Sequence, residues 1–318
     1  MGKIGRRVTG FFLLFFHLNK EKPGMVTRIE VGKDNSSWRK EESEAWQCEI
    51  VAKDHPKYKV VGHLSTVVGT RANQQDACYV SVEKDSNAIG VVCDGMGGMW
   101  GGEIASRVAL QTFVEDFEGV RYRENDFYNF FCEEMKKIDQ IVADLEDDGG
   151  RALSAGTTFL AASIVENRLR FVSVGDSKLY IIRGEKIQCV NREHNYLMLL
   201  KEQYQRGEIT GEVFWREKSK GAALISYLGM GNVDMIDVTP RCFRLREGDI
   251  VVLCSDGLYK ALTEDQILAI VRKNPIHLEK TLQELQTEAK TASGISQDNT
   301  SIVMMSCRRN ADRAGWTV

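Results

Sequence analysis

The sequence has few of the residues on which zinc clusters, disulfide frameworks and imidazole-bound transition metals depend. It contains only five histidines, which are scattered, and none of its eight cysteines forms a CxxC pair. A zinc cluster and a disulfide framework are therefore disfavoured, as is a transition-metal site built on imidazole. Cys93 and Cys254 lie inside apolar runs, which is typical of reduced, buried thiols in a cytoplasmic protein. Metal chemistry based on oxygen ligands stays open.

The chain also lacks a strong charge of either sign. Its formal net charge is −3, so no global basic field indicates a nucleic-acid partner. Attraction for an anionic substrate must then be local and come from a metal or from a single arginine. Hydrophobic residues make up 43% and charged residues 27%, a globular balance that argues against wholesale disorder.

The N-terminal region has an apolar run at 11–16 that is too short to span a bilayer. Basic residues precede the run, as at the start of a signal peptide, but no small-residue cleavage site follows it. We expect a disordered leader ahead of a start near Met25, with a signal-like segment or a weak membrane-surface anchor as the alternative. Membrane contact is thus expected only through residues 1–20.

From about residue 60, short β-type runs and helical runs follow one another in groups. Apolar patterns predict strands at 77–82, 88–93, 157–165, 169–174, 179–182, 187–190, 250–254 and 300–305. Spacings of three and four predict a helix after the glycines at 97–102, a second helix around 127–145, and two more at 264–273 and 278–291. Residues 195–221 are charged and irregular, so we expect a mobile surface insertion there.

Strands and helices come in groups here, without the strict alternation that a parallel sheet requires. This order predicts an α+β protein with a four-layer α-β-β-α sandwich, in which helices flank two antiparallel sheets. We expect a leader and polar, partly disordered N-terminal segment at 1–58, one domain at 59–310 and a tail at 311–318.

Aspartates stand at the ends of the predicted strands. Asp94, Asp176 and Asp256 each follow an apolar strand, whereas Asp76 and Asp298 each precede one. In an antiparallel sheet the end of one strand lies beside the start of its neighbour, so these five acids can meet at one edge. Unit charges about 4 Å apart interact by about 4 kcal/mol at intermediate dielectric, so such a cluster requires cations.

The residue types around this edge indicate which cations and which chemistry to expect. Oxygen ligands with few histidines favour Mg²⁺ or Mn²⁺. Two such ions sharing a carboxylate would activate a bridging water against phosphorus and neutralise charge on the phosphoryl oxygens. Arg71, five residues before Asp76, can clamp phosphate oxygens in a bidentate way that lysine cannot.

Six short motifs follow one another along the chain. They are Arg71-Ala-Asn-Gln-Gln-Asp76-Ala77, Asp94-Gly-Met-Gly-Gly98, Ala155-Gly-Thr-Thr158, Val174-Gly-Asp-Ser177, Ser255-Asp-Gly257 and Gln297-Asp-Asn299. In this order they resemble the motifs of the PPM family, the metal-dependent (type 2C) serine/threonine protein phosphatases, and in particular its bacterial branch. The stretch Arg206-Gly-Glu-Ile-Thr210 resembles the flap segment of that branch. The resemblance covers roughly residues 60–308.

The resemblance implies roles for individual residues. Asp94 would bridge two Mg²⁺ or Mn²⁺ ions, and the carbonyl of Gly95 would bind one of them. Asp256 and Asp298 would bind the other ion, and Asp176 matches a position for a third, weaker one. Asp76 would hold metal-bound water, Arg71 would bind phosphate, and Thr157 and Thr158 would pack or orient the site.

Three positions depart from the pattern of the family. Gln75 replaces a frequent glutamate, which removes a charge and implies weaker binding of the second metal. Met96 stands where some members place a histidine proposed as general acid, and methionine cannot donate a proton. His194, which follows Glu193 rather than the usual aspartate, is an alternative acid, although a solvated loop histidine is the simpler interpretation.

The leading functional hypothesis is hydrolysis of phosphoserine or phosphothreonine in proteins. It implies phosphoprotein substrates, a cognate serine/threonine kinase, a monomeric enzyme and a cytoplasmic location. Two alternatives stay open: a non-catalytic regulatory module with the same fold, and a phosphatase of small phosphorylated metabolites.

Overall fold

The computed structural model describes residues 46–51, 58–83, 87–97, 101–120, 127–147 and 149–309. The predicted leader, the apolar run at 11–16 and the tail at 311–318 lie outside these ranges. Within them no helix combines the length and apolarity that a membrane crossing needs.

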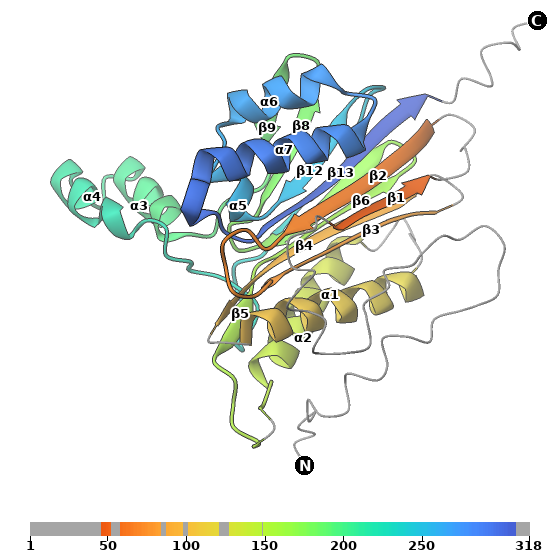
Figure 1. Cartoon of the computed structure of the whole chain (residues 1–318). Helices are drawn as coiled ribbons and strands as arrows, with labels where there is room; N and C mark the ends of the chain where they lie inside the picture. Colours follow the sequence, from red (N-terminus) through yellow and green to blue (C-terminus); the bar gives the residue numbers. More distant parts are fainter. Residues whose placement is uncertain are drawn as a thin grey trace, which may run out of the picture.

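Two antiparallel sheets form the centre of the molecule (Figure 1). Sheet A has the strand order β1-β2-β13-β12-β8-β9, and sheet B has the order β10-β7-β6-β4-β3, with β11 paired to β7 and β5 paired to β4. The strands of sheet A are β1 (Trp46–Val51), β2 (Tyr58–Val67), β13 (Thr300–Arg309), β12 (Ile250–Cys254), β8 (Lys178–Arg183) and β9 (Lys186–Cys189). Those of sheet B are β10 (Asp237–Val238), β7 (Arg168–Val174), β6 (Phe159–Val165), β4 (Ala88–Gly97), β3 (Asp76–Val82), β11 (Phe243–Arg244) and β5 (Ala155–Thr157).

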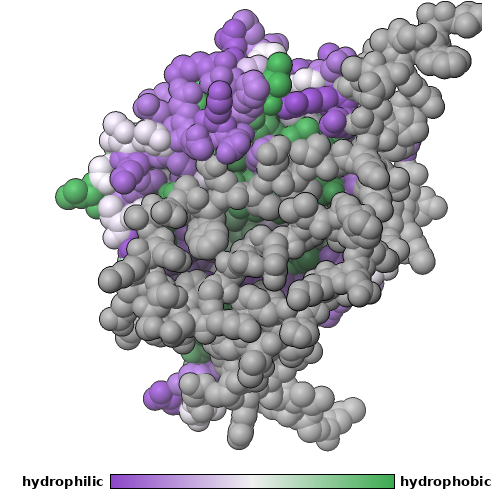
Figure 2. Space-filling model, turned by 45° about the vertical axis from the view of Figure 1, so that its right-hand side comes forward, coloured by the Kyte–Doolittle hydropathy of each residue, from purple (hydrophilic) through white to green (hydrophobic). Residues whose placement is uncertain are grey.

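Helices cover the outer face of each sheet. Sheet B carries α1 (Gly101–Val120) and α2 (Phe127–Ala143), and sheet A carries α6 (Glu264–Lys273) and α7 (Leu278–Ser293). The short α5 (Asp256–Tyr259) follows β12 directly. In Figure 2 the upper part of the visible described surface, on the side of α6 and α7, is mainly hydrophilic. The predicted four-layer sandwich is confirmed.

Three apolar layers hold these four layers of structure together. Strand residues alternate between them: Val92 lies in the layer between the sheets, whereas Val91 faces the layer beneath α1 and α2. That second layer is rich in phenylalanine, and the ring centroids of Phe113 and Phe159 lie 4.9 Å apart. A third layer joins sheet A to α6 and α7. The strand ends are therefore fixed by buried packing on both faces.

The segment at 195–221 differs from the expectation of an irregular insertion. It contains α3 (Tyr196–Gln205) and α4 (Gly211–Glu217), which project from one side of the sandwich (Figure 1). Asn195 and Thr210 cap the two helices by accepting hydrogen bonds from the backbone N–H groups of Met198 and Val213. The rings of Tyr204 and Phe214 pack 5.4 Å apart and join the helices. Most of the apolar side chains in this segment are not buried, so hydrophobic periodicity gave little signal.

Asp139 on α2 anchors the chain where it returns from these two helices to the sandwich. Its buried carboxylate accepts hydrogen bonds from the backbone N–H groups of Gly229, Gly231 and Val233, at 2.7, 3.2 and 2.9 Å. The backbone of Leu228 in turn pairs with Thr157, the last residue of β5. A single acid thus links α2 to the loop that lies beside the end of β4.

Asp139→Ala is expected to lower the free energy of unfolding by about 3 kcal/mol, because three backbone donors lose a charged acceptor. Chemical denaturation of the full chain measures this. Asp144, an exposed acid directly after α2, is the control. Asp144→Ala should change the free energy of unfolding by less than about 0.5 kcal/mol. Equal stabilities of the two variants would contradict the anchoring role.

Candidate active site

Two of the predicted acids meet across neighbouring strands of sheet B. Asp76 opens β3 and lies directly opposite Asp94 near the end of β4. Directly opposed residues in an antiparallel pair project to the same face of the sheet, so both carboxylates lie on one side. The register of β3 and β4 therefore brings together two acids that are 18 residues apart in sequence.

The other three acids come from strand ends in both sheets. Asp256 follows β12 as the first residue of α5, and Asp298 lies two residues before β13, the neighbour of β12 in sheet A. Asp176 follows β7 of sheet B and is 8% exposed. All four of the other acids act electrostatically on Asp94, so the five predicted aspartates converge.

Ser255 joins the two sheets at this point. Its hydroxyl donates a 2.7 Å hydrogen bond to Oδ2 of Asp76 and accepts one of 2.9 Å from the backbone N–H of Ser301. Asp76 belongs to sheet B, whereas Ser301 lies on β13 of sheet A and Ser255 directly follows β12 of the same sheet. One buried hydroxyl thus fixes the relative position of acids from different sheets.

The loop that carries Arg71 is held by the segment around Asp298. The side chain of Asn299 accepts a 2.8 Å hydrogen bond from the backbone N–H of Gln75 and donates to the carbonyls of Val68 and Asn73. Thr70 donates its N–H and its hydroxyl to the carbonyl of Gln297. Arg71 is therefore presented from a braced loop.

Thr157 and Thr158 hold the backbone of Asp94. The hydroxyl of Thr158 accepts a hydrogen bond from the Asp94 N–H at 2.9 Å, and its own N–H donates to the Asp94 carbonyl at 2.8 Å. The hydroxyl of Thr157 donates to the same carbonyl at 3.1 Å. Both side chains are buried, as expected for residues that orient the site.

His194 occupies a different environment from the solvated loop that the sequence suggested. It is fully buried, and its Nδ1 accepts the backbone N–H of Gly175 at 3.1 Å. Gly175 has φ +102°, and a Cβ there would lie 2.7 Å from the side chain of Thr158, so this turn requires glycine. Burial lowers the pKa of His194 to about 4. The histidine therefore positions the turn before Asp176. Its burial keeps it from acting as a proton donor at the acidic cluster.

Burial and mutual repulsion shift the acids strongly. Burial raises the pKa of Asp76 to about 7, with Asp256 and Asp298 adding to the shift and hydrogen bonds from Ser255 and Ser301 opposing it. Burial and the four neighbouring aspartates raise the pKa of Asp94 well above its usual value. Burial and Asp256 also raise the pKa of Asp176, while Lys260 and Tyr259 act in the opposite direction. These shifts show acids that lack sufficient countercharge.

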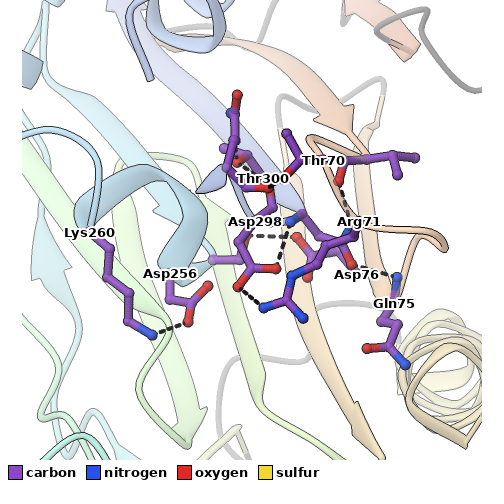
Figure 3. A network of polar contacts seen from close by, with 12 residues as sticks. Thr70, Arg71, Gln75, Asp76, Asp256, Lys260, Asp298 and Thr300 are labelled. Carbon is purple, nitrogen blue, oxygen red and sulfur yellow. Dashed lines mark hydrogen bonds and ion pairs between the residues drawn. The ribbon is translucent and has the colours of Figure 1, made fainter. Parts of the chain in front are cut away.

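Two cationic side chains of the protein contact the acids (Figure 3). Nη2 of Arg71 lies 2.6 Å from Oδ2 of Asp298, and Nζ of Lys260 contacts Oδ2 of Asp256. Within the described ranges, no three His, Cys, Asp or Glu side chains are arranged as a metal-ion site. The donor set nevertheless fits hard divalent cations, because it consists of carboxylates and because Oδ1 of Asp76 is buried without a partner.

Gln75 and Met96, the two departures from the family pattern, lie beside this cluster. The amide of Gln75 points toward α1 (Figure 3), and its Nε2 would lie 2.9 Å from a Cβ on Gly102. Met96 is half-buried on β4. A Cβ on Gly95 would lie 2.1 Å from the carbonyl oxygen of Gly102, so the chain next to Asp94 approaches α1 closely.

Two surface cavities, of about 310 and 590 Å³, are lined by none of the five aspartates. Sequence reasoning found the acids and Arg71 but missed the positioning roles of Ser255 and Asn299, and it missed Lys260. The motif positions of Ser255 and Asn299 were a usable signal, and Lys260 is four residues after Asp256, a spacing that places both on one helix face.

Comparison with known proteins identifies what this arrangement resembles. The family described as Protein phosphatase 2C matches residues 68–293. Protein phosphatase PhpP of Streptococcus pneumoniae is 28% identical over 252 residues, which cover 76% of this chain and 95% of PhpP.

Solved structures show the same fold. The serine/threonine phosphatase of S. agalactiae is 25% identical with a TM-score of 0.64, and the match covers 78% of this chain and 99% of that protein. The catalytic domain of the serine/threonine protein phosphatase PstP, solved with two manganese ions, has a TM-score of 0.60 over 79% of this chain and 99% of its own. At 23% identity, the PstP likeness shows the fold alone.

Asp76 makes the stability of the metal-free chain depend on pH. The unfolded chain releases this proton near pH 3.8 and the folded chain near pH 7, so the folded state binds more protons between these values. The contribution of Asp76 to stability is therefore lost as pH rises through this window. In the presence of a chelator, the stability of Asp76→Asn relative to the natural chain should increase by about 3 kcal/mol between pH 5 and pH 8.

Denaturation of both proteins at several pH values measures the difference. Asp234→Asn, at an exposed position, is the control and should follow the natural chain at every pH. A difference between Asp76→Asn and the natural chain that does not grow with pH would contradict the assignment.

Proposed function

Because this chain belongs to the protein phosphatase 2C family, we propose that it hydrolyses phosphoserine and phosphothreonine in proteins with the help of two Mg²⁺ or Mn²⁺ ions. The family match covers most of the chain. The observation that carries the proposal is the convergence of five aspartates from the strand ends of two sheets, next to an exposed arginine. A serine/threonine kinase would supply the substrates.

The acids divide into groups by position. Asp94 would contribute to both ion sites, the carbonyl of Gly95 would bind one of the ions, and Asp256 and Asp298 would bind the other. Asp176 lies at the corner of the cluster near Asp256. When bound, such ions supply positive charge against the phosphoryl oxygens and make water more acidic. A neutral amide at Gln75 adds no charge to this set.

Arg71 would bind the phosphoryl group. Its side chain is 58% exposed and contacts Asp298 at the surface, so it can turn toward a substrate without leaving a buried pair. The planar guanidinium offers two parallel N–H donors to two phosphate oxygens. Its loop is braced by Asn299, so the arginine holds the phosphoryl group in a fixed position relative to the acids.

Asp76 would orient the attacking water. Ser255 occupies its Oδ2, and its buried Oδ1 has no partner among the described residues and can accept a hydrogen bond from water. Met96 cannot protonate the leaving group because a thioether has no transferable proton. His194 cannot do so because it is buried and has no access to the substrate.

Turnover of a phosphothreonine peptide by the full chain tests the proposal. Activity should appear with Mn²⁺, disappear with a chelator and return when Mn²⁺ is added in excess. Asp94→Asn should lower kcat/KM at least about 100-fold, since loss of about 3 kcal/mol of transition-state stabilisation has that effect. Activity that survives chelation, or that is unchanged in Asp94→Asn, would exclude the mechanism.

The same assay separates the substrate classes. Turnover of the phosphopeptide should exceed that of free phosphoserine, and the opposite order would favour a phosphatase of small metabolites. A pure chain that neither binds Mn²⁺ nor turns over either substrate would favour a regulatory module.

Arg71→Lys is expected to lower kcat/KM about 10-fold, mainly through KM, because an ammonium cannot form two parallel bonds to the phosphoryl group. Steady-state kinetics on the phosphopeptide measure the change. Arg272→Lys is the control, since Arg272 makes a similar 2.6 Å surface pair with Glu185. Equal effects of the two substitutions would contradict phosphate binding by Arg71.

A further inference from the structure

Lys260 is a cation of the chain itself that lies within the acidic cluster. It caps the C-terminal end of α5, one helical turn after Asp256, and its Nζ contacts Oδ2 of that aspartate. Figure 3 shows the side chain extended alongside Asp256 with the ammonium at the carboxylate. The lysine thus occupies the Oδ2 side of this carboxylate.

The ammonium acts on more than its direct partner. The charges of Asp256, Asp176 and Asp94 all act on Lys260. Asp176 and Asp256 also repel each other, and the positive charge of Lys260 offsets part of that repulsion. Arg71 serves the other side of the cluster, at Asp298.

The formal charges limit how many ions the cluster can recruit. Five carboxylates with Arg71 and Lys260 carry −3, so two divalent ions already bring the cluster to +1. A further divalent ion next to the ammonium would be repelled strongly, because like charges at contact distance interact unfavourably even at intermediate dielectric. The lysine and another metal ion therefore compete for the same two carboxylates.

We propose that Lys260 is the resident cation of the Asp176–Asp256 corner and takes the place of a third divalent ion there. The inference rests on the proposed function insofar as the remaining acids bind divalent ions. Its consequence is that the chain recruits two ions from solution and supplies a cationic side chain in place of the third ion. That charge is present at every metal concentration and cannot be removed by a chelator.

Calorimetric titration of the full, chelator-stripped chain with Mn²⁺ tests the proposal, with bound manganese counted after gel filtration. Lys260→Asp should bind one more Mn²⁺ per chain than the natural protein, because it removes the competing charge and adds a carboxylate beside Asp176 and Asp256. Lys260→Arg keeps the cation and should bind the natural number. Should Lys260→Asp fail to fold, as judged by circular dichroism, Lys260→Asn offers an amide oxygen and should also gain an ion.

Lys273→Asp is the matched control, because Lys273 makes a similar surface pair with Glu284 on the helical layer, and it should gain no ion. A Lys260→Asp chain with natural stoichiometry, or a natural chain that binds three ions, would overturn the inference. The role of Lys260 is tested by the difference in bound Mn²⁺ between the variant and the natural chain. A natural chain that binds no Mn²⁺ therefore contradicts the proposed function, whereas an unchanged count in the variant contradicts only the role of Lys260.

Discussion

Repulsion between carboxylates at one rim is the constraint on which the rest of this site depends. Five acids that act on one another through partly buried surroundings destabilise the metal-free fold, and the raised pKa values of Asp76 and Asp94 express that repulsion. The acids can stay together only if the backbone that carries them is stabilised elsewhere. Three apolar layers provide this, since they pack both faces of each sheet almost to the ends of the strands.

Short-range contacts then convert a stable sandwich into a defined site. Ser255 ties Asp76 to the other sheet, Thr158 fixes the backbone of Asp94, and Asn299 braces the loop of Arg71. Each of these partners is uncharged. They position the acids without neutralising them. The cluster therefore still attracts cations strongly, while its carboxylates are held at fixed positions. Such preorganisation is what phosphoryl transfer requires of a protein.

Local patterns in the sequence were enough to predict the sandwich and the five acids. Alternation and apolar runs mark β4, β7 and β12, and an aspartate directly after a buried strand needs only the antiparallel rule to be placed at a common edge. The helices at 196–217 were missed because caps and aromatic contacts stabilise them with little burial. The burial of His194 was missed because it depends on Gly175, from a strand end 19 residues earlier, and no local pattern encodes such a contact. Lys260 was missed because a lysine on a short helix resembles any surface residue until its carboxylate partners are known.

Gln75 and Lys260 both affect the net charge of the acidic cluster. A glutamate at position 75 would add a further negative charge beside the cluster, whereas the amide instead packs near Gly102 at the start of α1. Lys260 supplies a positive charge at the opposite side, next to Asp256. Both residues make the metal-free cluster less negative, so both would reduce its attraction for divalent ions. Both residues change the electrostatic potential at the same carboxylates. Their effects on metal binding should therefore be coupled, so the two residues have to be interpreted together.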